Sequence, residues 1–289
     1  EGERMNQKAF AIFVGALMVL SGIAYFLPLG TNQKEIAVTS DANSPETFGV
    51  KGSLVDWSFD GLGDVLEMAP QNTDMAYWIN ISSSQNLTNA ASIALPQSIG
   101  LIYGDQLYST RIERLGEVRF NNTWAEFHWI EPYPVGYNSL VIPYEGYMMI
   151  PMGTDFVMAM GRPTLFGPQE AVQQSIDVIS GGQPSENFTL VDDSGADLQV
   201  AALGRGGASM PMAGGYKEFN LRITSSRNGE DGFDIVARYI QPTADTSRKA
   251  SDLAEKSDLE YSSSGSEGEL SGFVSEENIR FVLMGLLGP

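Results

Sequence analysis

The sequence contains no cysteine and a single histidine among its 289 residues. The lack of thiols excludes disulfides, thiolate metal sites and a cysteine nucleophile. The one histidine, His128, excludes zinc sites built from several histidines, and its place between two aromatic residues on a predicted strand favours a structural role. A domain without disulfides depends on its hydrophobic core, and a hydrophobic content of 43% can supply one.

Basic residues are also scarce. The chain has 17 Lys and Arg against 36 Asp and Glu, which gives a formal net charge of −19 at pH 7. Binding to nucleic acid or to anionic lipid requires clustered Lys and Arg side chains. The charge balance therefore argues against both as partners, and it indicates a self-repelling, soluble surface.

One long stretch has no charge at all. Ala9–Leu29 (AFAIFVGALMVLSGIAYFLPL) comprises 21 residues. As a helix it would reach ~31 Å, about the thickness of the hydrocarbon core of a bilayer. It is predicted to be a single transmembrane helix that anchors the chain in the lipid bilayer. Two alternatives stay open: a secretory signal cleaved after Gly22-Ile23-Ala24, and a core helix of a soluble domain.

The flanks of this helix predict its orientation. Arg4 and Lys8 precede it, and Lys34 is the only early basic residue after it. The positive-inside rule then favours a cytoplasmic N-terminus and an extracytoplasmic bulk at the cell membrane. The predicted organisation is a cytoplasmic N-terminus (1–8), the transmembrane helix (9–29), a linker (30–46), an extracytoplasmic α+β domain (47–242), an acidic serine-rich linker (243–272) and a C-terminal strand that packs back on a sheet (273–289).

The predicted fold class is α+β, with a strand-rich, mainly antiparallel ectodomain and few short helices. The clearest helix is Gln169–Ser180, which follows Pro168 and precedes Gly181-Gly182. Hairpins are expected at Asn121-Asn122 and Asn228-Gly229. Strands are expected at Asp74–Ser82, Ile99–Tyr103, Leu107–Ile112, Leu140–Ile150, Asp155–Phe166, Leu198–Leu203 and Asn278–Leu287, and short helices at Gly61–Met68 and Leu87–Leu95. Within the 243–272 linker, helical spacing permits a short exposed helix at Ala250, Leu253, Ala254, Ser257 and Tyr261.

Two groups of residues are candidate metal ligands. Seven of the twelve methionines lie between Met148 and Met212, and soft thioethers select Cu⁺; the candidates on predicted strands are Met148, Met152, Met158 and Met160. Packing in an irregular core is the alternative role for these methionines. Acidic turns at Asp192, Asp193 and Asp197 and at Asn228–Gly232 offer oxygen ligands for Ca²⁺, without the full spacing of an EF-hand.

Four N-x-Ser/Thr sequons occur, at Asn80, Asn86, Asn121 and Asn187. In an exported domain they are candidate glycosylation sites on exposed turns, and an unmodified surface asparagine is the alternative at each.

Two segments of the sequence have a pattern that is found in other proteins. A strand leads through Gly161-Arg162-Pro163-Thr164-Leu165-Phe166-Gly167 into a helix with Ala171, Val172 and Ile176, and Leu66-Glu67-Met68-Ala69-Pro70 precedes an aromatic strand. This pattern resembles uncharacterised exported, membrane-anchored α/β surface proteins of bacteria and archaea. The acidic, cysteine-free, single-anchor character is similar to that of archaeal surface proteins. The resemblance brings no known activity.

No residue cluster specifies a reaction, so the sequence predicts a non-enzymatic, membrane-anchored surface protein or an accessory subunit of a membrane complex, with no cofactor. Its expected partners are the lipid bilayer and other membrane or surface proteins, self-association included. A pilin-like filament subunit with Ala9–Leu29 in the filament core is one alternative, and eight mostly polar residues before the helix count against it. A surface receptor that binds a metal or another ligand is the other.

Overall fold

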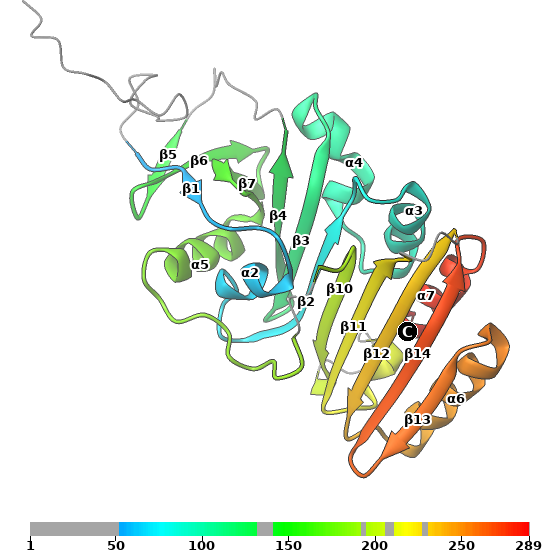
Figure 1. Ribbon diagram of the computed structural model, residues 1–289. Coiled ribbons are helices and arrows are strands. Elements are labelled where there is room, and N and C mark those ends of the chain that lie inside the picture. The colour runs from blue at the N-terminus through cyan, green and yellow to red at the C-terminus, as the bar shows by residue number, and fades with distance from the viewer. Residues whose placement is uncertain (1–51, 132–140, 192–194, 206–210, 227–230, 289) are drawn as a thin grey trace, which may run out of the picture. The chain divides into compact units, whose positions relative to one another are not determined.

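The structure is a computed structural model that describes residues 52–131, 141–191, 195–205, 211–226 and 231–288 (Figure 1). All of them belong to one compact unit, Ser44–Pro289. The predicted N-terminus, transmembrane helix and linker (1–46) lie outside the described residues. Within the described part, no helix has the length and apolar character needed to cross a bilayer.

A single antiparallel sheet of twelve strands forms the body of this unit. Its strands follow one another in space in the order β13 (Glu260–Ser264), β14 (Glu267–Ser275), β12 (Gly232–Ile240), β11 (Glu218–Ser225), β10 (Leu198–Leu203), β2 (Thr73–Asn80), β3 (Ile112–Phe120), β4 (Thr123–Ile130), β9 (Thr164–Pro168), β7 (Phe156–Ala159), β6 (Tyr147–Met152) and β5 (Ile142–Tyr144). A short parallel pair, β1 (Val55–Asp56) and β8 (Gly161–Arg162), accompanies it. The strand-rich α+β prediction is confirmed for the described residues.

The sheet has a hydrophobic core on each face because side chains alternate along its central strands. In β2, Tyr77 and Ile79 point into one core, and Ala76 and Trp78 into the other. Helices α3 (Gln85–Ala94), α4 (Ile99–Tyr108), α6 (Ala244–Ser257) and α7 (Ile279–Leu287) pack on the first face, and α2 (Leu62–Glu67) and α5 (Gln169–Ile179) on the second. A short 3-10 turn, Pro211–Gly214, lies against α7.

Several predicted elements are confirmed. Helix α5 buries Ala171, Val172 and Ile176. The hairpin of β3 and β4 turns at Asn121 and Asn122, whose φ angles of 49° and 60° are those that a two-residue hairpin turn requires. Strands β11 and β12 pair as expected, but their turn at 227–230 lies outside the described residues.

The prediction of strands at Ile99–Tyr103 and Leu107–Ile112 is wrong for most of its length, because residues 99–108 form α4. The buried face of α4 consists of Gly100, Gly104 and Tyr108. These residues are four apart and share one side of a helix, but two of them are glycines and give no apolar signal.

The C-terminal predictions also need correction. The 243–272 segment is not a linker: it contains the helix α6, the strand β13 and most of the strand β14. The expected helical positions Ala250, Leu253, Ala254 and Ser257 lie in α6, whereas Tyr261 lies in β13. Strand β14 is mostly polar because one of its faces is open, and it buries Gly268, Leu270 and Val274 at alternate or near-alternate positions. The expected strand at Asn278–Leu287 is helix α7, which buries residues at helical spacing: Ile279, Val282, Leu283, Leu286 and Leu287.

Candidate functional site

The candidate interaction surface is the open face of the sheet near β13. Helices α2 and α5 contact β2, β3, β4, β7 and β9, whereas α6 and α7 cover β13 and β14 from the other side. In the described chain, no helix lies over the remaining face of β12, β14 and β13. Most side chains on that face are charged or carry a hydroxyl group, with Val236, Ile240 and Phe273 as apolar exceptions.

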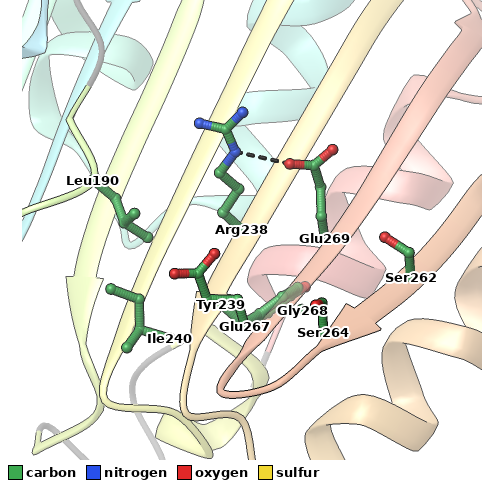
Figure 2. Close-up of a pocket in the computed structure, with 9 residues that line it drawn as sticks. All are labelled: Leu190, Arg238, Tyr239, Ile240, Ser262, Ser264, Glu267, Gly268 and Glu269. Atoms are coloured by element: carbon green, nitrogen blue, oxygen red, sulfur yellow. Dashed lines mark hydrogen bonds and ion pairs between the residues drawn. The ribbon is translucent and has the colours of Figure 1, made fainter.

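A shallow groove of about 220 Å³ lies on this open face. Figure 2 shows an ion pair at its upper end, where Arg238 Nε donates to Glu269 Oε2 at 2.9 Å from the directly opposite position on the next strand. Both side chains are nearly half exposed, so the pair is accessible to a partner. The full lining is Leu190, Arg238, Tyr239, Ile240, Ser262, Ser264, Glu267, Gly268 and Glu269.

The buried side chain of Glu218 fixes one wall of this groove. Its Oε1 accepts from the backbone N–H of Thr189 at 2.7 Å and of Leu190 at 2.8 Å. Its Oε2 accepts from the Thr189 hydroxyl at 2.6 Å. A carboxylate with three donors is well satisfied, so it holds Leu190 beside Ile240. The groove thus has an apolar wall next to carboxylates and hydroxyls. This mixture is better suited to contact with the surface of another protein than to holding a group that reacts.

A buried polar network lies on the opposite side of the sheet, beneath α4. Glu126 and His128 are both 0% exposed and sit two residues apart on β4. Glu126 Oε1 accepts from Ile99 N–H at 2.6 Å, and Oε2 accepts from Gly100 N–H at 2.8 Å. His128 Nε2 lies 2.7 Å from Glu126 Oε2, and its Nδ1 lies 2.6 Å from the hydroxyl of Tyr108. The network therefore binds both ends of α4 to the sheet.

The pKa of Glu126 reflects these contacts. Burial opposes ionisation of the carboxyl, but the hydrogen bond and the charge of His128, with the Gly100 N–H, outweigh it and lower the pKa. The carboxylate also lies at the positive end of the α4 dipole. Since Glu126 and His128 are sealed from solvent, their role in this structure is to position α4.

A second buried carboxyl, Glu117, behaves differently. Its Oε2 accepts from the Tyr77 hydroxyl at 2.8 Å, and its Oε1 accepts from Arg119 Nε at 2.6 Å. Burial raises its pKa to about 8 although Arg119 opposes this, and the nearby Glu126 charge adds to the rise. Glu117 therefore binds a proton up to a higher pH than an ordinary glutamate does. The sequence signal is an acidic residue among small or apolar neighbours on a strand that is buried on both faces: Glu126 follows Ala125 and Glu117 follows Gly116.

Some apolar side chains on the helices of this face are exposed. Ile102 and Tyr103 on α4 are 42% and 46% exposed, and Phe281 and Met284 on α7 are 52% and 42% exposed.

The candidate copper ligands divide between two clusters. Met148 and Met160 are buried in a small apolar cluster with Ile150, and Met152 packs against it. Met158 belongs to the larger core on the face of the sheet that α3, α4, α6 and α7 cover. Three of the four candidate thioethers are thus brought into one cluster, where they fill space among aliphatic side chains. The Cu⁺ site stays a prediction.

The predicted calcium turn is only partly described. Asp192 and Asp193 lie outside the described residues. Asp197 Oδ2 accepts from the backbone N–H of Ser225 at 2.6 Å and from its hydroxyl at 2.7 Å, so Asp197 has a structural role at the end of β11. Among the described residues there is no group of three or more acidic or histidine side chains arranged to hold a metal ion.

The four sequon asparagines differ in their contacts. Asn121 is exposed at the hairpin tip. Asn86 is exposed in the first turn of α3, and its Nδ2 donates to Glu276 at 2.6 Å. Asn187 Nδ2 donates to the carbonyl of Gln71 at 2.5 Å, and Asn80 is only partly exposed at the end of β2. Asn121 is therefore the most accessible candidate, and glycosylation stays a prediction at all four.

Comparison with known proteins assigns no family to this chain. No family model matches the chain, and no related curated protein was found. Similar solved structures include crystal forms I and IV of TP0453, both with a TM-score of 0.49 and 10% identity, which cover 81% and 83% of this chain and 98% and 99% of TP0453. Crystal form III has a TM-score of 0.47 and 10% identity, with 80% and 99% covered. These matches are distant, and no property of TP0453 is transferred to this chain.

Proposed function

We propose that this chain is a non-enzymatic, membrane-anchored extracytoplasmic protein that acts as a surface protein or as an accessory subunit of a membrane complex. The observation that carries the proposal is the uncharged 21-residue run Ala9–Leu29 ahead of a strongly acidic α+β unit. The run is long enough to span the bilayer once. Its flanking charges favour an N-terminus inside and the α+β unit outside.

Two features of the α+β unit support a role in binding to other proteins. The ionisable side chains buried beneath α4 are satisfied by one another and by the backbone, and they have no access to solvent. The groove on the open sheet face combines the accessible Arg238–Glu269 pair with the apolar side chains of Leu190 and Ile240. Such a mixture of apolar and polar groups is typical of non-obligate protein interfaces.

The anchor is tested by expressing the full chain beside a variant that lacks residues 9–29. We expect the full chain to stay in the membrane pellet after an alkaline carbonate wash and the deletion variant to be released. Protease added outside intact cells should digest the α+β unit of the full chain. A full chain that is released by carbonate, or that sediments as filaments without lipid, would contradict the proposal.

The interaction role is tested with a groove variant, Arg238→Glu combined with Ile240→Glu, whose added negative charge lies next to Glu267 and Glu269. The control is Gln173→Glu on α5, which adds a charge on the same face of the sheet but over β4, β7 and β9, several strands away from the groove. Proteins cross-linked to the wild-type chain in intact membranes are identified by mass spectrometry. We expect the groove variant to lose a cross-linked protein that the control retains; equal cross-linking in all three chains would argue against the groove as the binding site.

A further inference from the structure

The two outer strands of the twelve-stranded sheet differ in how they are protected from pairing with a further strand. An edge strand directs about half of its N–H and C=O groups away from the sheet, where another strand can pair with them. The outer strands of the described sheet are β13 and β5. Natural edges are blocked by proline, lysine, bulges or shortness.

Strand β5 is blocked in two of these ways. It has only three residues, and Pro143 at its centre has no N–H group to donate. The next strand, β6, contains a second proline, Pro151. A further strand therefore finds few backbone partners at this edge.

Strand β13 has none of these protective features, and it is longer than β5. Its five residues, EYSSS, include no proline and no lysine, and its pairing with β14 runs from Glu260 to Ser264 without a bulge. Ser262, Ser263 and Ser264 are exposed and small, so their side chains do not hinder an approaching strand.

Contacts with β14 and α6 also hold β13 in a fixed position. Leu259, just before the strand, is buried, and its N–H donates to Ala254 of α6 at 3.0 Å. The Tyr261 hydroxyl lies over Gly268 of β14, where a Cβ atom would come within 2.6 Å of it. Helix α6 packs on one face of β13 and β14, as Figure 1 shows, and does not pair with the backbone of β13. The edge is thus ordered before any partner binds, which lowers the entropic cost of pairing.

We propose that β13 pairs with β13 of a second copy of this chain, antiparallel and around a two-fold axis at Ser262. In this register Ser262 lies opposite Ser262 of the second copy, Tyr261 opposite Ser263, and Glu260 opposite Ser264. No two like charges face each other, although the chain is strongly acidic, and like charges at opposite positions would destabilise the pair. The sheets of the two copies then form one continuous sheet, with α6 and α7 of both copies on the same face.

Symmetry favours the pairing of β13 with β13 over the pairing of β13 with β5 of another copy. Pairing of β13 with β5 of another copy would be head-to-tail and would produce a ring or an open filament instead of a dimer. Pro143 disfavours that contact, whereas the β13 edge complements itself. The inference depends on the fold of the described unit and not on the membrane anchor, so it can fail without affecting the proposed function.

The absence of cysteine makes a direct test possible. The full chain is prepared with the single substitution Ser262→Cys, in detergent if it is membrane-bound, and exposed to a mild oxidant. Cysteines at the two-fold axis lie opposite each other, so we expect a disulfide-linked dimer. Ser180→Cys, exposed at the end of α5, and Ser264→Cys, which lies opposite Glu260, are the controls and should cross-link at most one-tenth as fast. A mixture of Glu260→Cys and Ser264→Cys chains should form the mixed dimer.

A second measurement does not depend on disulfide formation. Sedimentation velocity of the wild-type chain should show a monomer–dimer equilibrium that shifts toward dimer as salt rises from about 50 mM to about 500 mM, because salt screens the repulsion between the acidic copies. Ser262→Lys places two lysines face to face and should weaken the dimer about fivefold, whereas Ser180→Lys should not. A wild-type chain that stays monomeric at high concentration, or equal cross-linking at positions 180 and 262, would overturn the proposal.

Discussion

Substitution of Glu117 by glutamine tests the interpretation of the buried network most directly. The folded protein raises the pKa of Glu117 from an ordinary value of 4.5 to about 8. Between these two values the folded chain holds a proton that the unfolded chain has lost, so the free energy of unfolding falls as the pH rises. Each unit of pKa difference corresponds to about 1.4 kcal/mol, so this one carboxyl accounts for a fall of up to about 5 kcal/mol over its full titration, most of it between pH 4.5 and pH 8.

Glutamine has nearly the shape of a protonated glutamate and can keep the contact with the Tyr77 hydroxyl, but it does not ionise. Urea denaturation of the wild-type chain and of Glu117→Gln is compared at steps from pH 5 to pH 8 by tryptophan fluorescence. Groups that titrate in both proteins cancel in the difference between the two free energies of unfolding. We expect this difference to move in favour of the variant by several kcal/mol as the pH rises.

The matched control is Glu269→Gln, which removes a half-exposed partner of Arg238. Exposed ion pairs contribute about 0–1 kcal/mol, so the control should differ from the wild type by no more than that at any pH. Curves for the wild type and Glu117→Gln that run parallel from pH 5 to pH 8 would refute the buried, protonated state of Glu117.

Three further substitutions test other parts of the fold by the midpoint of urea denaturation. Gly100→Ala should destabilise the chain by about 1–3 kcal/mol, because the new Cβ would lie 2.5 Å from His128 Nε2; an unchanged midpoint would mean that α4 does not pack this closely. Asp197→Ala removes two hydrogen bonds to Ser225 and should cost about 1–3 kcal/mol, whether or not Ca²⁺ is added. Tyr239→Phe removes a buried hydroxyl that has no hydrogen-bond partner among the described residues, so it should raise the free energy of unfolding by about 1 kcal/mol, and a clear loss of stability would reveal a bonded partner.

The sequence predicts the elements whose pattern is local and complete. The turn at Asn121-Asn122 and the helix that begins after Pro168 both depend on backbone preferences of a few adjacent residues, and both form as expected. The C-terminal helix shows the limit of this approach. Asn278–Leu287 is so apolar that a strand and a helix both account for it, and the spacing of its buried residues is evident only once its packing against α3 is known.

The polar network could not be predicted because its members are far apart in sequence. Glu126 reaches Ile99 and Gly100 only because β4 passes beneath the start of α4. The sequence places Glu126 and His128 on one face of a strand, but it does not show that this face is buried. In the same way, the groove beside Leu190 depends on contacts between segments that are separated by tens of residues.

The presence of a core on each face of the sheet has a consequence for local unfolding. Strands β2 and β10 contribute side chains to both cores, so neither strand can leave the sheet without exposing apolar surface on both faces. Their backbone amides should exchange with deuterium only when the whole unit opens. Strands at the periphery, such as β5 and β13, lack this double attachment and should exchange sooner.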